Sequence, residues 1–244
     1  MTQMPPLALL AGGLAKRLRP LSESVAKVMA EVAGEPFIAH QLRLARRESI
    51  THVVLCVGYL GQQVEDFVGN GSQFGLAVDY CYDGPVLLGT GGALRRALGQ
   101  LGTEFLVMYG DSWLDAAFAP VVDAFRASGK PALMTVYRNF DRWDRSNVWF
   151  ENGHIRAYDK EMRLPQMQHI DWGLSMVKAE VLAAEPAGEP IDLAAIYSAL
   201  ARKDLLAGYE MTTRFYEIGS PAGLRETDEL LRNDRGLNTK PRNT

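Results

Sequence analysis

Three short segments with glycine follow apolar runs of strand length, and two of them also contain charged residues. Residues 7–20 have the sequence LALLAGGLAKRLRP, in which Gly12 and Gly13 end the apolar run. Residues 88–94 have the sequence LGTGGAL, and residues 105–111 have the sequence FLVMYGD. Glycine lets a ligand approach backbone N–H groups, and neighbouring cations add positive charge. Such segments can bind phosphate, so an anion site is the first chemistry that the sequence indicates.

The first segment has two interpretations. The glycine turn at 11–13, followed by the cations of KRLR at 16–19, can cradle an anion, or it can be a tight turn with solvated charges. It is not a P-loop, because the pattern G-x-x-x-x-G-K-[ST] is absent. The dinucleotide pattern G-x-G-x-x-G also fails, since Leu94 stands at its third glycine.

The other two segments also have two interpretations each. Gly89, Thr90 and Gly91 can form a flexible lip against a flat ring or a phosphate, or a helix N-terminus capped by Thr90. Asp111 ends a buried strand, where a desolvated carboxylate needs a partner. Magnesium with substrate phosphates is such a partner, because it takes few protein carboxylates. The alternative is a helix N-cap, a role for which Asp115 is better placed.

Alternating strands and helices must position these segments. Apolar runs of strand length alternate with helical patterns, the runs at 7–11, 52–57, 76–82, 105–109 and 132–137 and the helices at 36–49, 61–70, 91–101 and 116–129. This alternation predicts βαβ units and a parallel sheet covered on both faces. Ligands of such sheets bind beyond the carboxyl ends of the strands, so we expect the three segments to meet there.

The pattern changes after about residue 140. We expect a hairpin around Asn152-Gly153, a strand from residue 169 that leads into a short helix, and then a helix, a strand pair and a last helix at 192–202, 205–218 and 221–233. The predicted fold is therefore α/β: a Rossmann-like, mostly parallel mixed sheet with helices on both faces and an α+β elaboration in the C-terminal third. We expect one domain at 1–233 and a disordered polar tail at 234–244.

Composition excludes several classes of protein. Hydrophobic residues make up 47% of the 244 residues and charged residues 23%, which is typical of a globular chain. The net charge of −3 provides no field for nucleic acid. Cys56 and Cys81 lie in apolar runs, which argues against a disulfide framework, and no apolar run approaches ~18 residues. We expect a cytoplasmic, reduced protein with neither nucleic-acid nor membrane partners; nothing in the pattern indicates an oligomeric state.

Taken together, the motifs resemble the sugar-1-phosphate nucleotidyltransferases. That family opens with LAGGxGTRLxPLT and then a P-K-P segment, and this chain has LAGGLAKRLRPLS at 10–22 and Ala26-Lys27-Val28 at those places. The match continues in the family's order through LGTGGAL, Gly110-Asp111, Tyr158-Asp159-Lys160 and FYEIGSPAGL at 215–224.

The chain departs from the family pattern at several positions. Ala15 replaces the third glycine of the opening, Lys16 replaces the following threonine, and both prolines around Lys27 are missing. Glu217 stands where the family has aspartate, one methylene shorter. These changes remove no charged group, so the resemblance implies an active enzyme.

The resemblance also implies a reaction and a set of site residues. A sugar 1-phosphate attacks the α-phosphorus of a nucleoside triphosphate and expels pyrophosphate, with Mg²⁺ as cofactor. The nucleotide-binding half is about 1–138 and the sugar-phosphate half about 139–233. The implied catalytic residues are Arg17, Lys27, Asp111 and Lys160; the nucleotide contacts are Ala11, Gly12, Gly13, Arg17, Gly89, Thr90 and Gly91; the sugar-phosphate contacts are Lys160, Asn147 and Asp171; the magnesium ligands are Asp111 and Glu217.

The substrates remain open between two pairs at this point. Chain length, LGTGGA and the EIGSP ending resemble heptose-1-phosphate guanylyltransferases, whereas residues 59–80 resemble N-acetylmuramate-1-phosphate uridylyltransferases. The sequence favours GTP with a heptose 1-phosphate; the alternative is UTP with N-acetylmuramate 1-phosphate or another hexose 1-phosphate. A non-catalytic domain that senses nucleotide sugars is the alternative of a different class, and the retained Arg17, Lys27, Asp111 and Lys160 argue against it.

Overall fold

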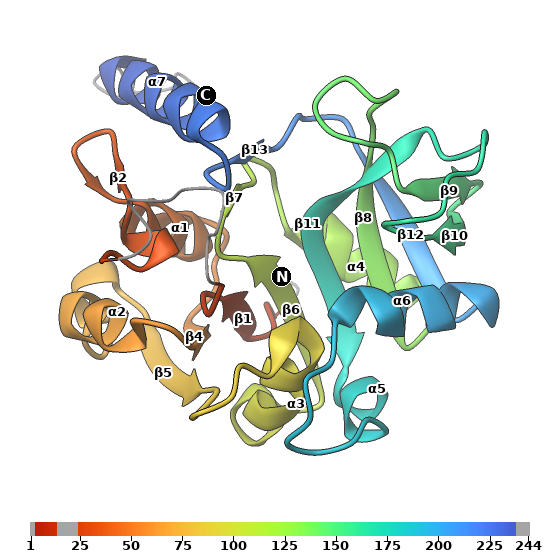
Figure 1. Cartoon of the computed structure of the whole chain (residues 1–244), viewed down its shortest axis with the longest axis horizontal. Helices are drawn as coiled ribbons and strands as arrows, with labels where there is room; N and C mark the ends of the chain where they lie inside the picture. The colour runs from red at the N-terminus through yellow and green to blue at the C-terminus, as the bar shows by residue number, and fades with distance from the viewer. Residues whose placement is uncertain (1–2, 14–23, 238–244) are drawn as a thin grey trace.

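A nine-stranded mixed sheet runs through the protein. The computed structural model describes residues 3–13 and 24–237, without the side chains of 234–237. The strands of the sheet, in chain order, are β1 (Leu7–Leu10), β4 (His52–Val57), β5 (Ala77–Tyr82), β6 (Glu104–Tyr109), β8 (Ala132–Arg138), β9 (Val148–Glu151), β10 (His154–Tyr158), β11 (His169–Lys178) and β12 (Leu206–Met211). Their spatial order is β5-β4-β1-β6-β11-β8-β12-β10-β9 (Figure 1).

Strand direction divides the sheet into a parallel block and a mixed block. β5, β4, β1 and β6 are parallel neighbours, and Leu7 of β1 aligns with both Val53 and Leu106. β11 is antiparallel to β6 and to β8, while β8 and β12 are parallel. The chain builds outward from β1 to β4 and β5, then returns to place β6 on the other side of β1. This reversal is the switch point where ligands of open α/β sheets bind.

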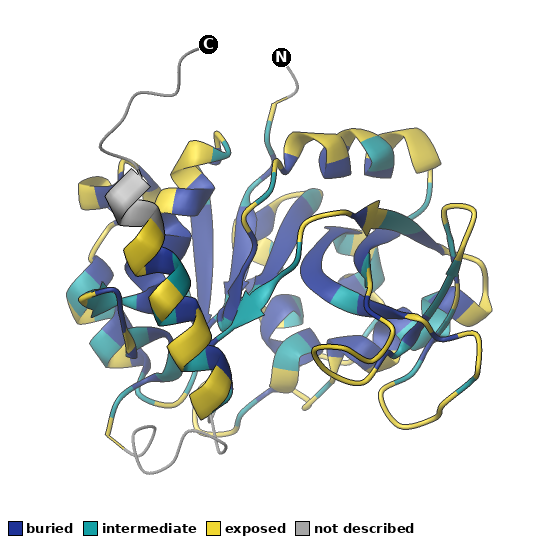
Figure 2. Cartoon of the chain, turned by 90° about the horizontal axis from the view of Figure 1, so that it is seen from above, coloured by how far each residue is buried: buried dark blue, intermediate teal, exposed yellow. Residues whose placement is uncertain are grey.

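Helices cover both faces of the sheet, as predicted. One buried cluster takes side chains from α1 (Phe37–Arg47), α2 (Gly61–Val68), α4 (Ala119–Ser128) and α7 (Pro221–Leu237). The other takes them from α3 (Gly89–Leu101), α5 (Ala179–Ala183) and α6 (Leu193–Arg202). Side chains alternate along the strands, so Leu7 and Leu9 belong to the first cluster and Ala8 to the second. Figure 2 shows the strands mostly buried and the helices exposed on their outer sides.

Local sequence explains where several helices begin and end. Asp192 caps α6, because its side chain accepts a hydrogen bond from the Ala194 amide at 3.0 Å. α4 has proline in its first turn and ends at Gly129, whose φ of +66° is in the left-handed region. Helix α4 begins at Ala119, three residues after the predicted start.

Two small sheets lie outside the main one. β2 (Glu31–Val32) pairs with β3 (Glu35–Pro36), and β7 (Ser112–Trp113) pairs with β13 (Tyr216–Glu217). The predicted strand pair at 205–218 is therefore wrong: β12 pairs with β8 in the main sheet, and β13 pairs with β7. Short 3₁₀ helices, η3 (Lys27–Met29) and η4 (Ser72–Phe74), complete the described elements.

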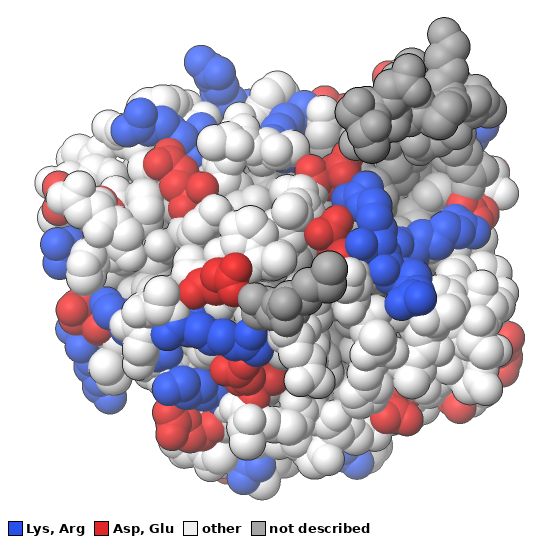
Figure 3. Space-filling model, turned by 180° about the vertical axis from the view of Figure 1, so that it is seen from behind, with Lys and Arg blue, Asp and Glu red and all other residues white. Residues whose placement is uncertain are grey.

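The C-terminal helix is longer than the sequence predicted. α7 continues to Leu237, four residues into the segment expected to be disordered, and residues 238–244 lie outside the described part of the chain. None of the described helices is long and apolar enough to cross a lipid bilayer. On the face seen in Figure 3, Lys and Arg side chains are interspersed with Asp and Glu. Several of the described ion pairs join partly exposed side chains, for example Arg126–Glu104 at 2.6 Å.

Candidate active site

Two cavities open at the carboxyl ends of the strands and meet at Tyr109 and Asp111. The smaller, of about 440 Å³, lies over β5, β4, β1 and β6, and the larger, of about 700 Å³, lies toward β11 and β13. Tyr109 ends β6, and Asp111 follows it after Gly110. We call them the nucleotide cavity and the sugar cavity, after the roles that the sequence predicted. Their shared wall is where two substrates can come into contact.

Lys27 and Asp111 form an ion pair at this shared wall. The Lys27 Nζ lies 2.5 Å from the Asp111 Oδ2, and the two side chains are 13% and 31% exposed. Gly110 lets the end of β6 lie close against the end of β1, because a Cβ at this position would lie 2.5 Å from the Leu10 carbonyl oxygen. The structure thus brings together two predicted catalytic residues that are far apart in the sequence.

The glycine turn after β1 forms one wall of the nucleotide cavity. Ala11, Gly12 and Gly13 line it, and the Ala11 amide donates to the Cys56 carbonyl at 2.8 Å. A Cβ at Gly12 would lie 3.1 Å from the Gly58 amide nitrogen, whereas Gly13 has no neighbour within 4 Å of that position. The backbone is therefore accessible at Gly13. The predicted Arg17 lies outside the described residues.

The LGTGG segment forms the start of α3 and packs against the chain just before α6. The Gly91 amide donates to the Ile191 carbonyl at 2.8 Å, and a Cβ at Gly89 (φ +68°) would lie 2.7 Å from the same oxygen. Gly89 and Thr90 line the nucleotide cavity, but Gly91 is not among its lining residues. A backbone contact from Gly91 to the nucleoside is therefore not supported by this geometry, because its amide is already used.

Thr90 caps a different helix from the one considered in the sequence. Its Oγ1 accepts a hydrogen bond from the Leu193 amide at 2.8 Å and donates to the Asp192 Oδ1 at 3.0 Å, at the start of α6. Asp192 in turn lies 3.6 Å from the Lys160 Nζ. Burial acts to raise the pKa of Asp192, but hydrogen bonds and the Lys160 charge outweigh it and lower that pKa. The Asp192 carboxylate therefore contacts both Thr90, which lines the nucleotide cavity, and Lys160, which lines the sugar cavity.

A partly buried hydrogen-bonded cluster surrounds Asp171 in the sugar cavity. Its Oδ2 accepts hydrogen bonds from the hydroxyls of Tyr109 and Tyr158, at 3.3 Å and 3.4 Å. Its amide donates to the Asn147 Oδ1 at 3.2 Å, and its Oδ1 accepts from the Gly173 amide. Burial raises the pKa of Asp171, and Lys160 partly opposes this. The predicted sugar contacts Asn147, Lys160 and Asp171 all line this cavity.

Sequence reasoning missed several residues of the sugar cavity. Tyr109 and Tyr158 were not among the predicted site residues, yet both hydroxyls reach Asp171. Trp172 is fully buried and donates to the Thr213 carbonyl at 2.7 Å, which favours packing over sugar contact. The signal for Tyr109 was available: a phenol at the end of a buried strand needs a partner for its hydroxyl.

An arginine stacked between two aromatic rings forms the outer end of the sugar cavity. The Arg214 guanidinium lies 3.3 Å from the ring centroid of Trp143 and 4.4 Å from that of Tyr216. It also donates two hydrogen bonds to Glu226, both 2.7 Å long. Trp143, Arg214, Tyr216 and Glu226 all line the cavity. Their spacing in the sequence gave no indication of this arrangement.

Asp111 and Glu217 provide an oxygen donor set that is suited to magnesium. β7 and β13 place them close together, since Glu217 aligns with Ser112 and the Ile218 amide donates to the Asp111 carbonyl at 2.9 Å. The Glu217 carboxylate accepts hydrogen bonds from the Gly219 amide and the Ser220 hydroxyl. Each carboxylate oxygen has a second lone pair, and magnesium needs only one or two carboxylates beside phosphates. No group of three acidic, His or Cys metal ligands occurs in the described residues.

Comparison with known proteins identifies the family. The family model described as nucleotidyl transferase matches residues 8–145, more than half of the chain. The chain belongs to the nucleotidyl transferase family. The N-acetylmuramate α-1-phosphate uridylyltransferase of Neisseria meningitidis is 26% identical over 234 residues, which cover 91% of this chain and 96% of that protein. The mannose-1-phosphate guanylyltransferase of Mycobacterium tuberculosis is 27% identical over 237 residues, which cover 95% of this chain and 66% of that protein.

Solved structures share the fold. A putative glucose-1-phosphate thymidylyltransferase from Bacillus anthracis, in complex with a sucrose, has a TM-score of 0.82 at 21% identity, covering 94% of this chain and 96% of that one. HddC from Yersinia pseudotuberculosis, complexed with GMP-PN, has a TM-score of 0.77 at 18% identity, covering 93% and 100%. These likenesses confirm the predicted α/β architecture.

Proposed function

We propose that this protein transfers a nucleotidyl group from a nucleoside triphosphate to a sugar 1-phosphate. The observation that supports this most directly is the junction of the two cavities at Tyr109 and Asp111. A phosphate oxygen of the sugar 1-phosphate forms a bond to the α-phosphorus, the bond from the α-phosphorus to the bridging oxygen of the β-phosphate breaks, and pyrophosphate leaves. Both substrates are polyanions, so alignment and charge neutralisation are the main catalytic requirements.

Named residues are assigned to these requirements. Lys27 contacts the phosphates near the reacting α-phosphorus, and Lys160 contacts the phosphate of the sugar. Arg17, whose planar guanidinium suits bidentate binding of phosphate, is assigned to the β- and γ-phosphates. Asp111 and Glu217 would hold magnesium, which supplies additional positive charge to the phosphates when bound. Asp171 and Asn147 contact the sugar. No protein nucleophile is needed in this scheme.

We propose GTP and a heptose 1-phosphate as the substrates, with UTP and N-acetylmuramate 1-phosphate or another hexose 1-phosphate as the alternative. The similar proteins include both a uridylyltransferase and a guanylyltransferase. Pyrophosphate release, measured with each of four nucleoside triphosphates and a panel of sugar 1-phosphates, tests the activity and both pairs at once. Nucleotide-sugar binding without pyrophosphate release from any pair would instead support a non-catalytic sensing domain.

A further inference from the structure

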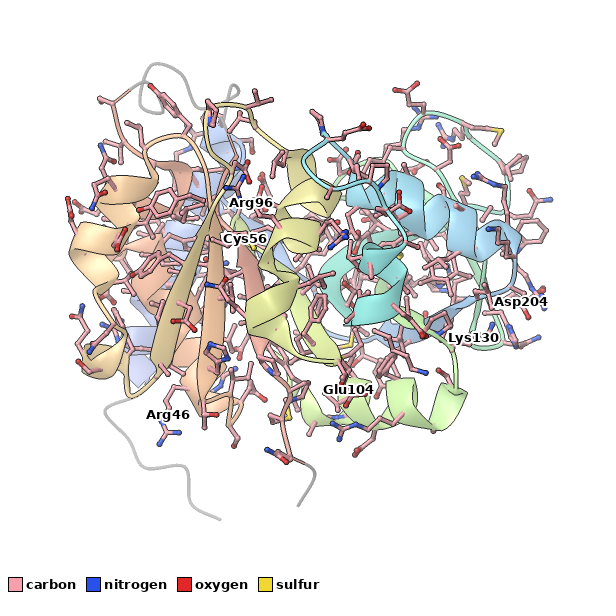
Figure 4. The ribbon with its side chains drawn as sticks, turned by 90° about the horizontal axis from the view of Figure 1, so that it is seen from below. Arg46, Cys56, Arg96, Glu104, Lys130 and Asp204 are labelled. Atoms are coloured by element: carbon pink, nitrogen blue, oxygen red, sulfur yellow. The ribbon has the colours of Figure 1, made fainter. Side chains whose placement is uncertain are left out.

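One side chain on α2 holds the segment directly before Lys27. The Gln63 Oε1 accepts a hydrogen bond from the Ala26 amide at 2.9 Å, and the Gln63 Nε2 donates to the Ser24 carbonyl at 2.8 Å. A single side-chain amide thus contacts two backbone groups that lie two residues apart. Figure 4 labels Cys56, a lining residue of the nucleotide cavity, on β4, the strand that leads into α2. Gln63 therefore ties the segment before Lys27 to the parallel part of the fold.

Ala26 is the residue for which this contact matters most. It is 3% exposed and stands immediately before η3, where its carbonyl accepts from the Met29 amide at 2.8 Å. The amides at the start of a helical turn have no partner within that turn. A buried amide needs a partner elsewhere, and Gln63 provides it for Ala26. Loss of the Gln63 side chain removes that partner and one anchor of the backbone.

Proline at position 26 would hold the same backbone without a hydrogen bond. The family pattern has prolines on both sides of this lysine, whereas this chain has Ala26 and Val28. The φ of Ala26 is −58°, which lies in the range that a proline ring imposes. Proline also has no N–H, so it would need no acceptor. A hydrogen bond from Ala26 to Gln63 and a proline ring are thus two ways to fix one conformation.

Lys27 depends on this conformation because its ammonium group stands at the end of a flexible side chain. That group lies 2.5 Å from the Asp111 Oδ2, but the backbone at the base of the side chain sets the direction from which it comes. After Lys27, Val28 packs close to Gly110, where a Cβ would lie 2.9 Å from the Val28 Cγ1. Before Lys27, the two hydrogen bonds of Gln63 provide the restraint.

We propose that Gln63 is a positioning residue for Lys27 in nucleotidyl transfer, an inference that rests on the proposed function and adds a residue to it. Gln63 is not among the lining residues of either cavity, so it acts through Lys27 and does not contact a substrate. Its two hydrogen bonds keep the lysine ready to contact the phosphates near the α-phosphorus. A contact from a neighbouring helix thereby replaces the stiffness of the missing proline.

Pyrophosphate release, measured with the substrate pair that the wild type uses best, tests this inference. Gln63→Ala is expected to lower kcat on the order of 10- to 100-fold, because a displacement of about 1 Å at a phosphate-binding group has effects of this size. KM for the sugar 1-phosphate should stay nearly unchanged. Gln62→Ala is the matched control, since Gln62 is exposed on the same helix and bonds to Asp66 of that helix at 2.9 Å. Thermal unfolding shows whether each variant is folded.

Two double variants distinguish positioning of Lys27 from a general contribution to stability. Ala26→Pro, introduced together with Gln63→Ala, is expected to restore kcat to within about threefold of the wild type, because proline restricts the backbone at a compatible φ. The two changes are made together, since the proline Cδ would occupy the place of the hydrogen bond to Gln63. Gln63→Ala combined with Lys27→Ala should be no slower than Lys27→Ala alone, because no lysine is left to position.

The outcomes separate this inference from the proposed function. A wild-type kcat in Gln63→Ala overturns the inference and leaves nucleotidyl transfer standing. No recovery with Ala26→Pro, or a further loss on top of Lys27→Ala, overturns it as well, because Gln63 then supports the fold and not the lysine. Absence of pyrophosphate release by the wild type with every substrate pair overturns the proposed function and this inference with it.

Discussion

The ammonium group of Lys27 and the carboxylate of Asp111 are held 2.5 Å apart, although the residues are separated by 84 positions. Lys27 begins η3 and Asp111 follows β6, so the pair depends on the tertiary fold. Both side chains are partly buried, and the pair lies where the two cavities meet. Removing either partner leaves the other charge without compensation in a partly desolvated place, which is costly. The pair therefore makes both residues sensitive sites for substitution.

Asp111→Asn is expected to reduce kcat by about 100-fold or more while leaving the fold intact. The amide keeps the shape of the side chain but removes the charge that would hold magnesium, and loss of one such electrostatic contact has effects of this size. Pyrophosphate release at saturating magnesium measures it. Asp115→Asn is the control, because Asp115 makes a surface ion pair with Arg47. A variant that retains more than about a tenth of the wild-type rate contradicts the assignment of Asp111.

Lys160→Ala is expected to raise KM for the sugar phosphate and to leave KM for the triphosphate nearly unchanged. Lys160 lines only the sugar cavity, where it pairs with Asp192. Arg17→Ala should show the opposite pattern, together with a slower chemical step. Steady-state kinetics with each substrate varied in turn separates the two, and Lys203→Ala on the exposed end of α6 is the control. If Arg17→Ala weakens only sugar-phosphate binding, the two phosphates have been assigned the wrong way round.

Local patterns were enough to predict the parallel half of the fold. Each apolar run became a strand, and parallel strands present their carboxyl ends at one edge, so Gly12, Gly89 and Asp111 had to come close together. Strand pairing in the mixed half of the sheet could not be predicted from local patterns. β11 inserts between β6 and β8, and β13 leaves the main sheet to pair with β7. Such long-range pairings depend on which edges are free after collapse, and the pattern within one strand does not specify this.

Contacts between polar side chains that are distant in the sequence could not be predicted either. Thr90 and Asp192 are 102 positions apart, and Tyr109 and Asp171 are 62 apart. Each residue alone has an ordinary interpretation, as a helix cap or a packed ring.

Asp171→Asn is expected to change the pH dependence of stability. Burial raises the pKa of Asp171 above its usual 3.8. Between 3.8 and the higher folded value, the folded state holds a proton that the unfolded state has lost, so stability falls as pH rises through that window. The asparagine variant lacks this fall. Its free energy of unfolding relative to wild type, from urea titrations between pH 3 and pH 7, should therefore increase with pH.

Asp159→Asn provides a comparison of opposite sign. Hydrogen bonds from the Met162 and Glu161 amides lower the pKa of Asp159 below 3.8. Its stabilisation is present above 3.8 and is lost as pH falls through the folded pKa, so this variant should become relatively less stable as pH rises through the window below 3.8. If both variants follow the same trend, burial does not control the protonation of Asp171.

Glu217→Gln is expected to lose most activity, whereas Glu217→Asp keeps part of it and requires more magnesium. The carboxylate accepts hydrogen bonds from the Gly219 amide and the Ser220 hydroxyl at the turn before α7. Glutamine keeps one acceptor oxygen, which can take the bond from the Gly219 amide, but its amino group cannot accept the bond from Ser220, and it has no charge for a metal ion. Aspartate keeps the charge with a shorter reach, and magnesium tolerates little distortion of its octahedral shell. Titration of magnesium against rate distinguishes the two variants.

Ser220→Ala distinguishes a structural role of Glu217 in the turn before α7 from a role in binding magnesium. It removes the hydroxyl that donates to Glu217 and accepts from the Gly223 amide at 3.0 Å, but it leaves the carboxylate in place. If Glu217 acts on magnesium, Ser220→Ala should lower stability and keep nearly the wild-type magnesium requirement. If Glu217 only supports the turn, Ser220→Ala and Glu217→Gln should lower stability alike, and the glutamine variant should show wild-type magnesium dependence. That result would leave Asp111 as the only one of the two proposed magnesium ligands that still stands.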